Sequence, residues 1–327
     1  MTSILYTFDR AFMRKTYEAV DRHVDVPSAY LALGPEARGS STTLAEVEPD
    51  DDTSVDEAVD DVNPDVVVRN HRLRPGEFAF DTERTVVHVR HGASIGRSEV
   101  DVTLDHLREV VDVALAPGEQ WATRYREGFP DDVCVSTVGI PEADRLANSD
   151  APGERRVLYA PTNHNYGAGS YLDTAEDVLE TFADTAYDLL FRPHPMDRIE
   201  EPGKSLTERC RDRIEDLPNV TFDEAETPTE SLLAADILVS DYSGIITEWL
   251  HTDRPLVQLA TLAGDRDVPA IGTVTDELDL ELVDDLYEDG LPPETRQRRD
   301  RFRADLGIPM DGRASERVAT ELQTCTA

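Results

Sequence analysis

Residues 236–249 read DILVSDYSGIITEW, and this stretch decides the fold. An apolar run leads into the polar, glycine-containing segment 240–244, and an amphipathic segment follows it. A short buried strand that passes through such a loop into a helix is the repeating unit of α/β folds. The stretch therefore predicts a strand over 236–239 and a helix over 244–250, joined by a loop at the carboxyl end of the strand.

The same alternation of apolar runs and amphipathic segments extends through the chain in both directions. We expect strands over 4–7, 29–33, 65–68, 85–89, 111–115, 133–137, 157–160, 188–192, 219–222 and 256–259. We expect helices over 10–22, 54–61, 104–110, 118–127, 174–187, 206–217, 229–234, 293–306 and 313–324. A chain of 327 residues favours two domains at roughly 100–200 residues each.

The polar segment 146–156, LANSDAPGERR, is the best candidate for a linker between the two domains. It predicts an N-terminal domain over 1–147 and a C-terminal domain over 153–327 that includes the last helices. The fold class is α/β, with two doubly wound Rossmann-like domains that face a central cleft. Ligands of such domains bind outside the carboxyl ends of the strands.

The charge of the chain excludes several functions. Acidic residues number 68 and basic residues 32, which gives a net charge of −36, and the only lysines are Lys15 and Lys204. Such a chain lacks the clustered cations that nonspecific nucleic-acid binding requires, so we expect no nucleic-acid partner. An acidic, lysine-poor composition that retains arginine is typical of extreme halophiles, although an ordinary acidic mesophilic protein is the alternative.

Neither a metal nor a cofactor is expected. Cys134, Cys210 and Cys325 lie far apart and have no zinc-ligand spacing, so they predict reduced thiols of a cytoplasmic protein. The acidic run 50–52 is interpreted as surface charge. The N-terminal residues do not resemble a signal peptide, and no apolar stretch is long enough to span a membrane.

The loop after the strand at 236–239 is the first candidate binding site. Ser243 and Gly244 stand at the start of the following helix, where backbone N–H groups and the helix dipole attract anions such as phosphate. Glu248 follows Gly244 by one helical turn and could reach a sugar or glycerol hydroxyl. An ordinary N-cap would explain Ser243 equally well.

Residues 189–195, LLFRPHP, form the second candidate. Two prolines hold the loop, Arg192 offers paired donors to a phosphate, and His194 can donate or accept a proton near neutral pH. A proline-stiffened turn is the simpler interpretation of this segment when it is taken alone.

Three more loops follow strands. His91 and Gly92 begin one, Thr162 stands in the segment VLYAPTNHN at 157–165, and VGIPEAD occupies 138–144. Each alone fits an ordinary loop. Together the candidates gather at strand ends, which is the side where α/β domains bind ligands.

The segments LYAPT, FRPHP and VSDYSGIITEW, at these spacings, resemble the CDP-glycerol glycerophosphotransferase family of teichoic-acid primases and polymerases, which has a GT-B fold. RHG and GIPEAD complete the pattern, and the resemblance covers roughly residues 80–260. It implies that His91 and His194 are catalytic, that Arg192, Ser243 and Gly244 bind donor phosphates, and that Glu248 binds the donor polyol. Gly92, Thr162 and Asp241 are further candidates for substrate contact.

The resemblance also implies a reaction. A CDP-activated polyol would bind the second domain, and a hydroxyl of a glycan or polyprenyl-linked acceptor would enter from the first, with His91 as general base. Arg192 and His194 would stabilise leaving-group charge, and CMP would be released. The pathway implied is cell-surface polysaccharide synthesis, with any membrane contact peripheral and at the inner face.

The sequence departs from the family at three points. Asn163, His164 and Asn165 replace an aromatic–arginine pair, Gly244 replaces a second serine, and Arg97 is the nearest base where a lysine is usual. Two alternatives therefore stay open. One is a sugar-nucleotide enzyme of the same fold, either a glycosyltransferase or a UDP-sugar 2-epimerase. The other is a non-catalytic protein that binds nucleotide or glycan.

Overall fold

The computed structural model describes residues 3–8, 10–33, 46–47, 55–70, 83–90, 92–93, 107, 109–166, 171–225, 227–259 and 269–326. These residues fall into two compact units. The described residues of the first unit lie within 1–93, 107–144 and 306–326, and those of the second lie within 145–305. His91 and Arg97 lie outside the described residues, as does most of the helix expected over 104–110.

The first unit is built on a seven-stranded sheet of order β3-β2-β1-β4-β5-β6-β7, in which all paired strands are parallel. The strands are β1 (Ile4–Phe8), β2 (Ser28–Ala32), β3 (Glu46–Val47), β4 (Val66–Arg69), β5 (Thr85–Val89), β6 (Val113–Ala116) and β7 (Cys134–Thr137). The helices are η1 (Ala11–Met13), α1 (Arg14–Asp21), α2 (Val55–Val62), α5 (Glu119–Gly128), η2 (Pro141–Ala143) and α13 (Ala314–Cys325).

The pleat of β1 explains how helices cover both faces of this sheet. Successive side chains of a strand point to opposite faces. Ile4, Tyr6 and Phe8 belong to one core cluster with buried residues of α1 and α13. Leu5 lies in a second cluster with residues of α2. This mostly apolar strand is therefore buried on both sides, as expected for a parallel sheet.

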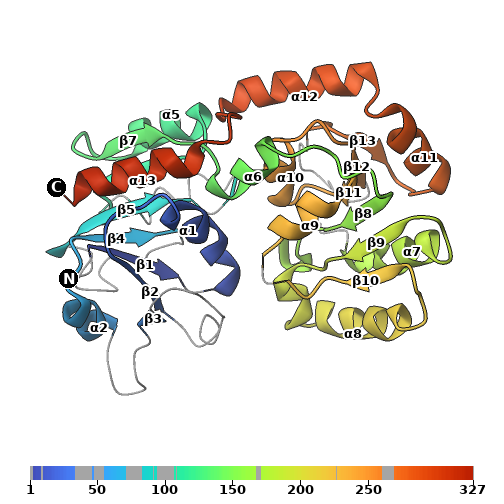
Figure 1. Cartoon of the computed structure of the whole chain (residues 1–327), viewed down its shortest axis with the longest axis horizontal. Helices are drawn as coiled ribbons and strands as arrows, with labels where there is room; N and C mark the ends of the chain where they lie inside the picture. The colour runs from blue at the N-terminus through green and yellow to red at the C-terminus, as the bar shows by residue number, and fades with distance from the viewer. Residues whose placement is uncertain are drawn as a thin grey trace. The chain divides into compact units, whose positions relative to one another are not determined.

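The second unit contains a six-stranded parallel sheet of order β10-β9-β8-β11-β12-β13 (Figure 1). Its strands are β8 (Arg156–Tyr159), β9 (Asp188–Phe191), β10 (Val220–Phe222), β11 (Ile237–Ser240), β12 (Leu256–Leu259) and β13 (Thr273–Thr275). Its helices are η3 (His164–Tyr166), α7 (Tyr171–Phe182), η4 (Pro195–Arg198), α8 (Gly203–Ile214), α9 (Thr229–Ala234), α10 (Ile245–Trp249), α11 (Leu280–Asp289) and α12 (Pro293–Leu306). The short helix α6 (Asp144–Ala147) lies at the boundary between the units.

Both sheets reverse their strand order at one point. In the first unit the reversal lies between β1 and β4, and in the second it lies between β8 and β11. Chain segments leaving two such strands turn away from each other, which opens a ligand crevice at the carboxyl ends. In the second unit the loops after residues 160 and 240 follow the two strands at the reversal, and they carry two of the predicted motifs.

The elements agree closely with the sequence prediction. The eleven expected strands are all present, with ends that differ by no more than two residues. The short strands β3 and β13 were not predicted. The end of the expected linker is tied to the second unit, because Asp236 accepts hydrogen bonds from the backbone N–H groups of Gly153 at 2.7 Å and Glu154 at 2.9 Å.

The expected domain boundary is wrong at the C-terminus, because α13 belongs to the first unit. Asp144 of the GIPEAD turn accepts hydrogen bonds from the N–H groups of Ala314 at 2.8 Å and Ser315 at 2.7 Å. The first N–H groups of a helix lack partners within it, so a carboxylate there is stabilising. Arg317 also donates to the carbonyl of Val138 at 2.9 Å. These contacts join segments far apart in sequence, so local pattern did not predict them.

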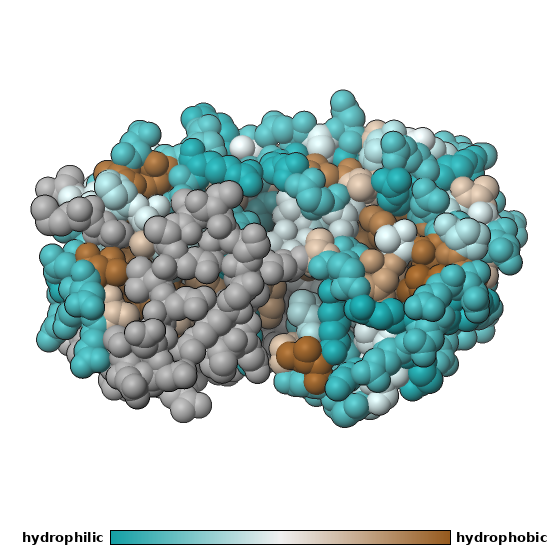
Figure 2. All heavy atoms as spheres, turned by 60° about the horizontal axis from the view of Figure 1, so that its bottom comes forward, coloured by the Kyte–Doolittle hydropathy of each residue, from teal (hydrophilic) through white to brown (hydrophobic). Residues whose placement is uncertain are grey.

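The described surface is mostly hydrophilic. In the view of Figure 2, hydrophilic residues form most of the coloured surface, and hydrophobic residues show as separate patches. Leu172, Ile199 and Val274 are large hydrophobic residues that are exposed. None of the helices among the described residues combines the length and apolar character needed to cross a membrane.

Candidate functional site

Asp241 joins the two loops at the crevice of the second unit. It follows β11, it is 2% exposed, and it accepts hydrogen bonds from Thr162 in the loop after β8. The Thr162 backbone N lies 2.9 Å from Oδ2, and the Thr162 hydroxyl lies 2.6 Å from Oδ1. The N–H of Ser243 donates to the same Oδ1 at 2.9 Å. Asp241 and Thr162, both expected to contact substrate, thus hold the loops together through their side chains.

Gln258 extends this support from β12. Its Oε1 accepts hydrogen bonds from the backbone N–H groups of Ile271 at 2.8 Å and Gly272 at 2.7 Å. Its Nε2 donates to the carbonyl of Asp241 at 3.2 Å. The sequence analysis missed Gln258. The available signal was an amide inside the otherwise apolar strand LVQL at 256–259, because a buried polar side chain requires partners.

Ser243, Gly244 and Glu248 lie where the sequence placed them, after β11 and along the short helix α10. Gly244 precedes α10 with helical backbone angles, φ of −55° and ψ of −26°, and the carbonyl of Ser243 accepts a hydrogen bond from the N–H of Ile246 at 3.0 Å, so Ser243 as an ordinary helix cap stays an alternative. Ser243 is 9% exposed and Glu248 is 1% exposed. Their contacts with donor phosphate and polyol stay a prediction.

Arg192 is engaged with protein groups in this structure. Its guanidinium lies 2.7 Å from Oδ2 of Asp223 and 2.9 Å from the carbonyl of Ala225. Burial acts to raise the pKa of Asp223, but the charge of Arg192 and hydrogen bonds from Ser231 and Arg192 outweigh it and hold that pKa below its usual value. Arg192 therefore joins the loops after β9 and β10, and its direct contact with phosphate stays a prediction.

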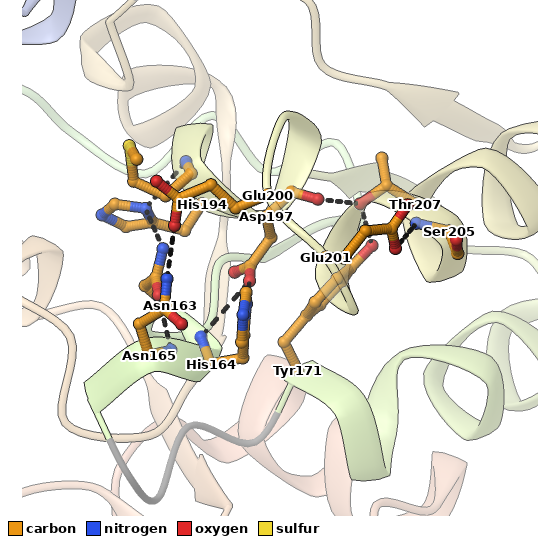
Figure 3. Close-up of polar contacts among 11 residues, drawn as sticks. Asn163, His164, Asn165, Tyr171, His194, Asp197, Glu200, Glu201, Ser205 and Thr207 are labelled. Atoms are coloured by element: carbon orange, nitrogen blue, oxygen red, sulfur yellow. Dashed lines mark hydrogen bonds and ion pairs between the residues drawn. The ribbon is translucent and has the colours of Figure 1, made fainter.

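His194 and Asn163 bring the FRPHP loop against the loop after β8. His194 is partly exposed and is the N-cap residue of η4, where its Nδ1 accepts a hydrogen bond from the N–H of Met196 at 3.2 Å. The side-chain amide of Asn163 lies 3.3 Å from the same ring nitrogen (Figure 3). The two segments thus meet at the crevice of the second unit, as their position after neighbouring strands predicts.

A buried histidine–aspartate pair lies beside this contact. His164 is hydrogen-bonded through Nδ1 to Asp197, which is fully buried. Burial raises the pKa of the Asp197 carboxyl, and hydrogen bonds from His164 partly offset that effect. A Cβ at Gly203 would lie 2.6 Å from Oδ1 of Asp197, so only glycine allows α8 to begin this close to the pair. The sequence analysis gave neither His164 nor Asp197 a role.

In the first unit the structure brings the HG loop and the GIPEAD turn together. Gly92 is buried, with φ of +67°, a left-handed conformation that favours glycine. A Cβ at this position would lie 3.8 Å from the carboxylate of Glu142. The ammonium of Lys15, on α1, lies 3.9 Å from the same carboxylate oxygen. Glu142 and Lys15 were not among the predicted site residues, and the catalytic role of the adjacent His91 stays a prediction.

A sequence profile decides the family of the chain. The profile described as CDP-glycerol:poly(glycerophosphate) glycerophosphotransferase matches residues 61–323. The chain belongs to this glycerophosphotransferase family. It is accordingly a transferase, and the recognition that rested on DYSG, RPHP and APT is confirmed. No curated protein sequence matches the chain.

Solved structures show the fold of this glycerophosphotransferase. The wall teichoic acid polymerase TagF is 17% identical with a TM-score of 0.71, and the match covers 99% of this chain and 88% of that chain. A TagF variant with CDPG is 14% identical with a TM-score of 0.67, covering 99% and 89%. At these identities the likeness shows the fold alone. It confirms the predicted GT-B fold class, while the expected cleft between the domains stays a prediction.

Two further solved structures share the fold of this glycerophosphotransferase. The S. aureus MnaA–UDP structure is 13% identical with a TM-score of 0.59, and it covers 99% of this chain and 96% of that chain. UDP-GlcNAc 2-epimerase from Neisseria meningitidis, bound to UDP-GlcNAc, is 14% identical with a TM-score of 0.58, covering 99% and 100%. The epimerase alternative therefore has the same fold as this chain. The family match favours glycerophosphate transfer over it.

Within the described residues, no group of three or more His, Cys, Asp or Glu side chains is arranged to hold a metal ion. The glycerophosphotransferase is expected to act through its own side chains, and that expectation stays a prediction. In the second unit the described donors at the strand ends, from Thr162, Ser243 and Arg192, are hydrogen-bonded to protein acceptors in this structure.

Proposed function

We propose that this protein transfers a glycerol phosphate unit, or a related phosphopolyol, from a CDP-activated donor to an acceptor hydroxyl. The family match over residues 61–323 carries this proposal. The meeting of the loops after β8, β9 and β11 at the reversal point of the second sheet supports a donor site in that unit.

The proposed step is a displacement at phosphorus. The acceptor oxygen forms a bond to the phosphorus that carries the polyol, and the bond from that phosphorus to the bridging oxygen of the diphosphate breaks. CMP leaves with the bridging oxygen. The hydroxyl proton passes to His91, the proposed general base. His194, Arg192, the Ser243 hydroxyl and the Gly244 N–H stabilise charge on the phosphates. Glu248 binds the polyol.

The proposed acceptor is a glycan or a polyprenyl-linked glycan of cell-surface polysaccharide synthesis. We further propose that the protein works in the cytoplasm, with peripheral contact at the inner face of the membrane when the acceptor is lipid-linked. Because a net charge of −36 opposes binding to an anionic membrane surface by charge, we propose that this contact is made through the acceptor or through a partner.

Donor choice tests the reaction. The protein is incubated in molar KCl with CDP-glycerol, CDP-ribitol or UDP-GlcNAc and a polyol phosphate primer, and nucleotide products are separated by chromatography. We expect CMP from a CDP donor, in amounts that match primer extension, and no UDP-sugar epimerisation. UDP or an epimerised sugar without CMP release would instead support the sugar-nucleotide alternative.

Two histidine variants test the division of roles. His194→Ala is expected to weaken CDP-glycerol binding and lower turnover together, because it removes a donor to the phosphates. His91→Ala is expected to leave nucleotide affinity nearly unchanged and lower turnover by about 10²–10⁴-fold, the usual contribution of a general base. Calorimetry gives the affinity and CMP release gives the turnover. Full activity of His91→Ala would exclude it as the base.

A further inference from the structure

The ring of His194 is contacted on one nitrogen by two groups. The backbone N of Met196 lies 3.2 Å from Nδ1, and the Asn163 side-chain nitrogen lies 3.3 Å from it (Figure 3). Asn163 is 1% exposed, so its amide is held within the protein and does not exchange partners with water. The protonation of His194 therefore depends on which way these two groups present their hydrogens.

The orientation of the Asn163 amide is fixed by its other end. The backbone N–H of Asn165 donates to Oδ1 of Asn163 at 2.6 Å, and only the oxygen of an amide can accept that hydrogen. The NH₂ group must then face His194. The N–H of Met196 is also a donor and cannot reverse. Two donors directed at one ring nitrogen require that nitrogen to present its lone pair.

We propose that Asn163 is a positioning residue that holds His194 as a neutral imidazole with its proton on Nε2. The inference rests on the proposed function only in assigning the proton a target, an oxygen of the donor diphosphate. With Nδ1 committed as an acceptor, Nε2–H is a hydrogen-bond donor. His194 thus stabilises phosphate charge, and it does not take the proton of the acceptor hydroxyl, which requires a different base.

Three successive contacts hold Asn163 in place. Asn163, His164 and Asn165 face His194, Asp197 and Glu200, respectively, and Asn165 Nδ2 lies 2.5 Å from Glu200 Oε2. Residues three apart eclipse one another on a 3₁₀-helix, so the spacing 194, 197, 200 presents one face along η4 and the turn after it. Figure 3 shows the two triplets opposite each other. The buried His164–Asp197 contact anchors the set at its centre.

The charges around His194 do not themselves dictate the tautomer. Arg192 and Asp197 lie on the same segment, His164 comes from η3, and Asp241 comes from the loop after β11. Both carboxylates of the second triplet have hydrogen-bond partners in the first, Asp197 with His164 and Glu200 with Asn165. Asn163 and Met196 each contact Nδ1, and of the two only Asn163 does so through a side chain, so position 163 is where a substitution changes what this nitrogen meets.

Nitrogen NMR measures the tautomer without substrate. Long-range ¹H–¹⁵N spectra of protein labelled with ¹⁵N-histidine separate a protonated from an unprotonated ring nitrogen, and His194→Gln assigns the signal. At pH 7.5 we expect the Nε2–H tautomer for His194. A proton on Nδ1, or a doubly protonated ring at this pH, would overturn the proposal, and this measurement needs no folded variant at position 163.

Asn163→Asp replaces the hydrogen-bond donor that faces Nδ1 of His194 by an acceptor. A carboxylate can only accept, so Nδ1 is expected to gain a proton. Above the pKa of the ring, the neutral imidazole then has no proton on Nε2, and turnover is expected to fall by about 10²–10³-fold, as when one donor to a developing charge is lost. Below that pKa the imidazolium keeps Nε2–H, so activity should return and the pH–rate profile should gain a basic limb. Leu172→Asp adds one negative charge at an exposed position of the same unit, outside these contacts, and its histidine spectrum should match the parent.

The outcomes separate the two proposals. If Asn163→Asp keeps the parent tautomer and pH profile while circular dichroism shows it folded, Asn163 does not position His194. If the tautomer is as expected but no CDP donor yields CMP, the proposed reaction fails and the positioning role stands.

Discussion

At the scale of single residues, the site of the second unit depends on buried polar groups with several partners each. The carboxylate of Asp241 receives hydrogen bonds from the backbone and the hydroxyl of Thr162 and from the N–H of Ser243. Removing one partner from such a group lowers the free energy of unfolding, because the remaining polar atoms stay buried without a hydrogen bond. The motif residue Asp241 thus supports the residues that we propose to contact the donor.

The Thr162–Asp241 contact gives a residue-scale prediction. Thr162→Val keeps the shape of the side chain but removes the hydroxyl that lies 2.6 Å from the buried carboxylate. The free energy of unfolding is expected to fall by about 1.5–3 kcal/mol, the usual contribution of a hydrogen bond to a charged group. Thr162→Ser retains the hydroxyl and should lose less. Urea unfolding in 2 M KCl measures both, and equal stability of the valine variant and the parent would contradict this role for Thr162.

At the scale of elements, α13 shows how one carboxylate fixes a helix to a distant turn. Asp144→Ala removes the acceptor for the N–H groups of Ala314 and Ser315. We expect a loss of about 0.5–2 kcal/mol in unfolding free energy, as for loss of a helix cap, and Asn at 144 should recover part of it. Thermal and urea unfolding provide the measurement. Unchanged stability would mean that α13 is held by its apolar face alone.

The cysteines test the packing of α8 and β7. Cys210 is 1% exposed, and burial raises the pKa of its thiol to about 12. At pH 8 the Cys210 thiol therefore stays protonated and inaccessible to reagents. Cys134, in contrast, is exposed. Burial also raises the pKa of the half-buried Cys325. A thiol reagent at pH 8 should modify Cys134 first, Cys325 slowly and Cys210 only after unfolding.

Cys134→Ser is the control for that experiment, because it should remove the fast phase and leave the others. Rapid modification of Cys210 in the folded protein would show that α8 does not pack as described.

At the scale of the whole molecule, the net charge of −36 governs stability in solution. Like charges repel in the compact state, and at 1 M salt the Debye length falls to about 3 Å, which screens most of that repulsion. We propose a halophilic protein whose melting temperature rises steeply between 0.1 and 3 M KCl. Calorimetry at each concentration checks this, with sucrose at equal osmolarity as the uncharged control. A melting temperature that does not change with KCl would contradict the halophilic interpretation.

The α/β class, eleven of the strands and the family could all be predicted from the amino-acid sequence. These features depend on local pattern: strands buried on both faces are mostly apolar, and the loops after them carry the motif residues in order. His194, Ser243 and Thr162 could be proposed as site residues because each stands in a motif that follows a predicted strand.

The contacts of those side chains could not be predicted without the folded structure. Arg192 is paired with Asp223, Asp241 accepts hydrogen bonds from Thr162, and α13 packs with the first unit. In each case the partner lies far away in sequence. The contact of Asn163 with His194 likewise requires two loops that meet only when β8 and β9 pair side by side. Hydrogen-bond partners across a fold depend on strand order and register, which no local pattern encodes.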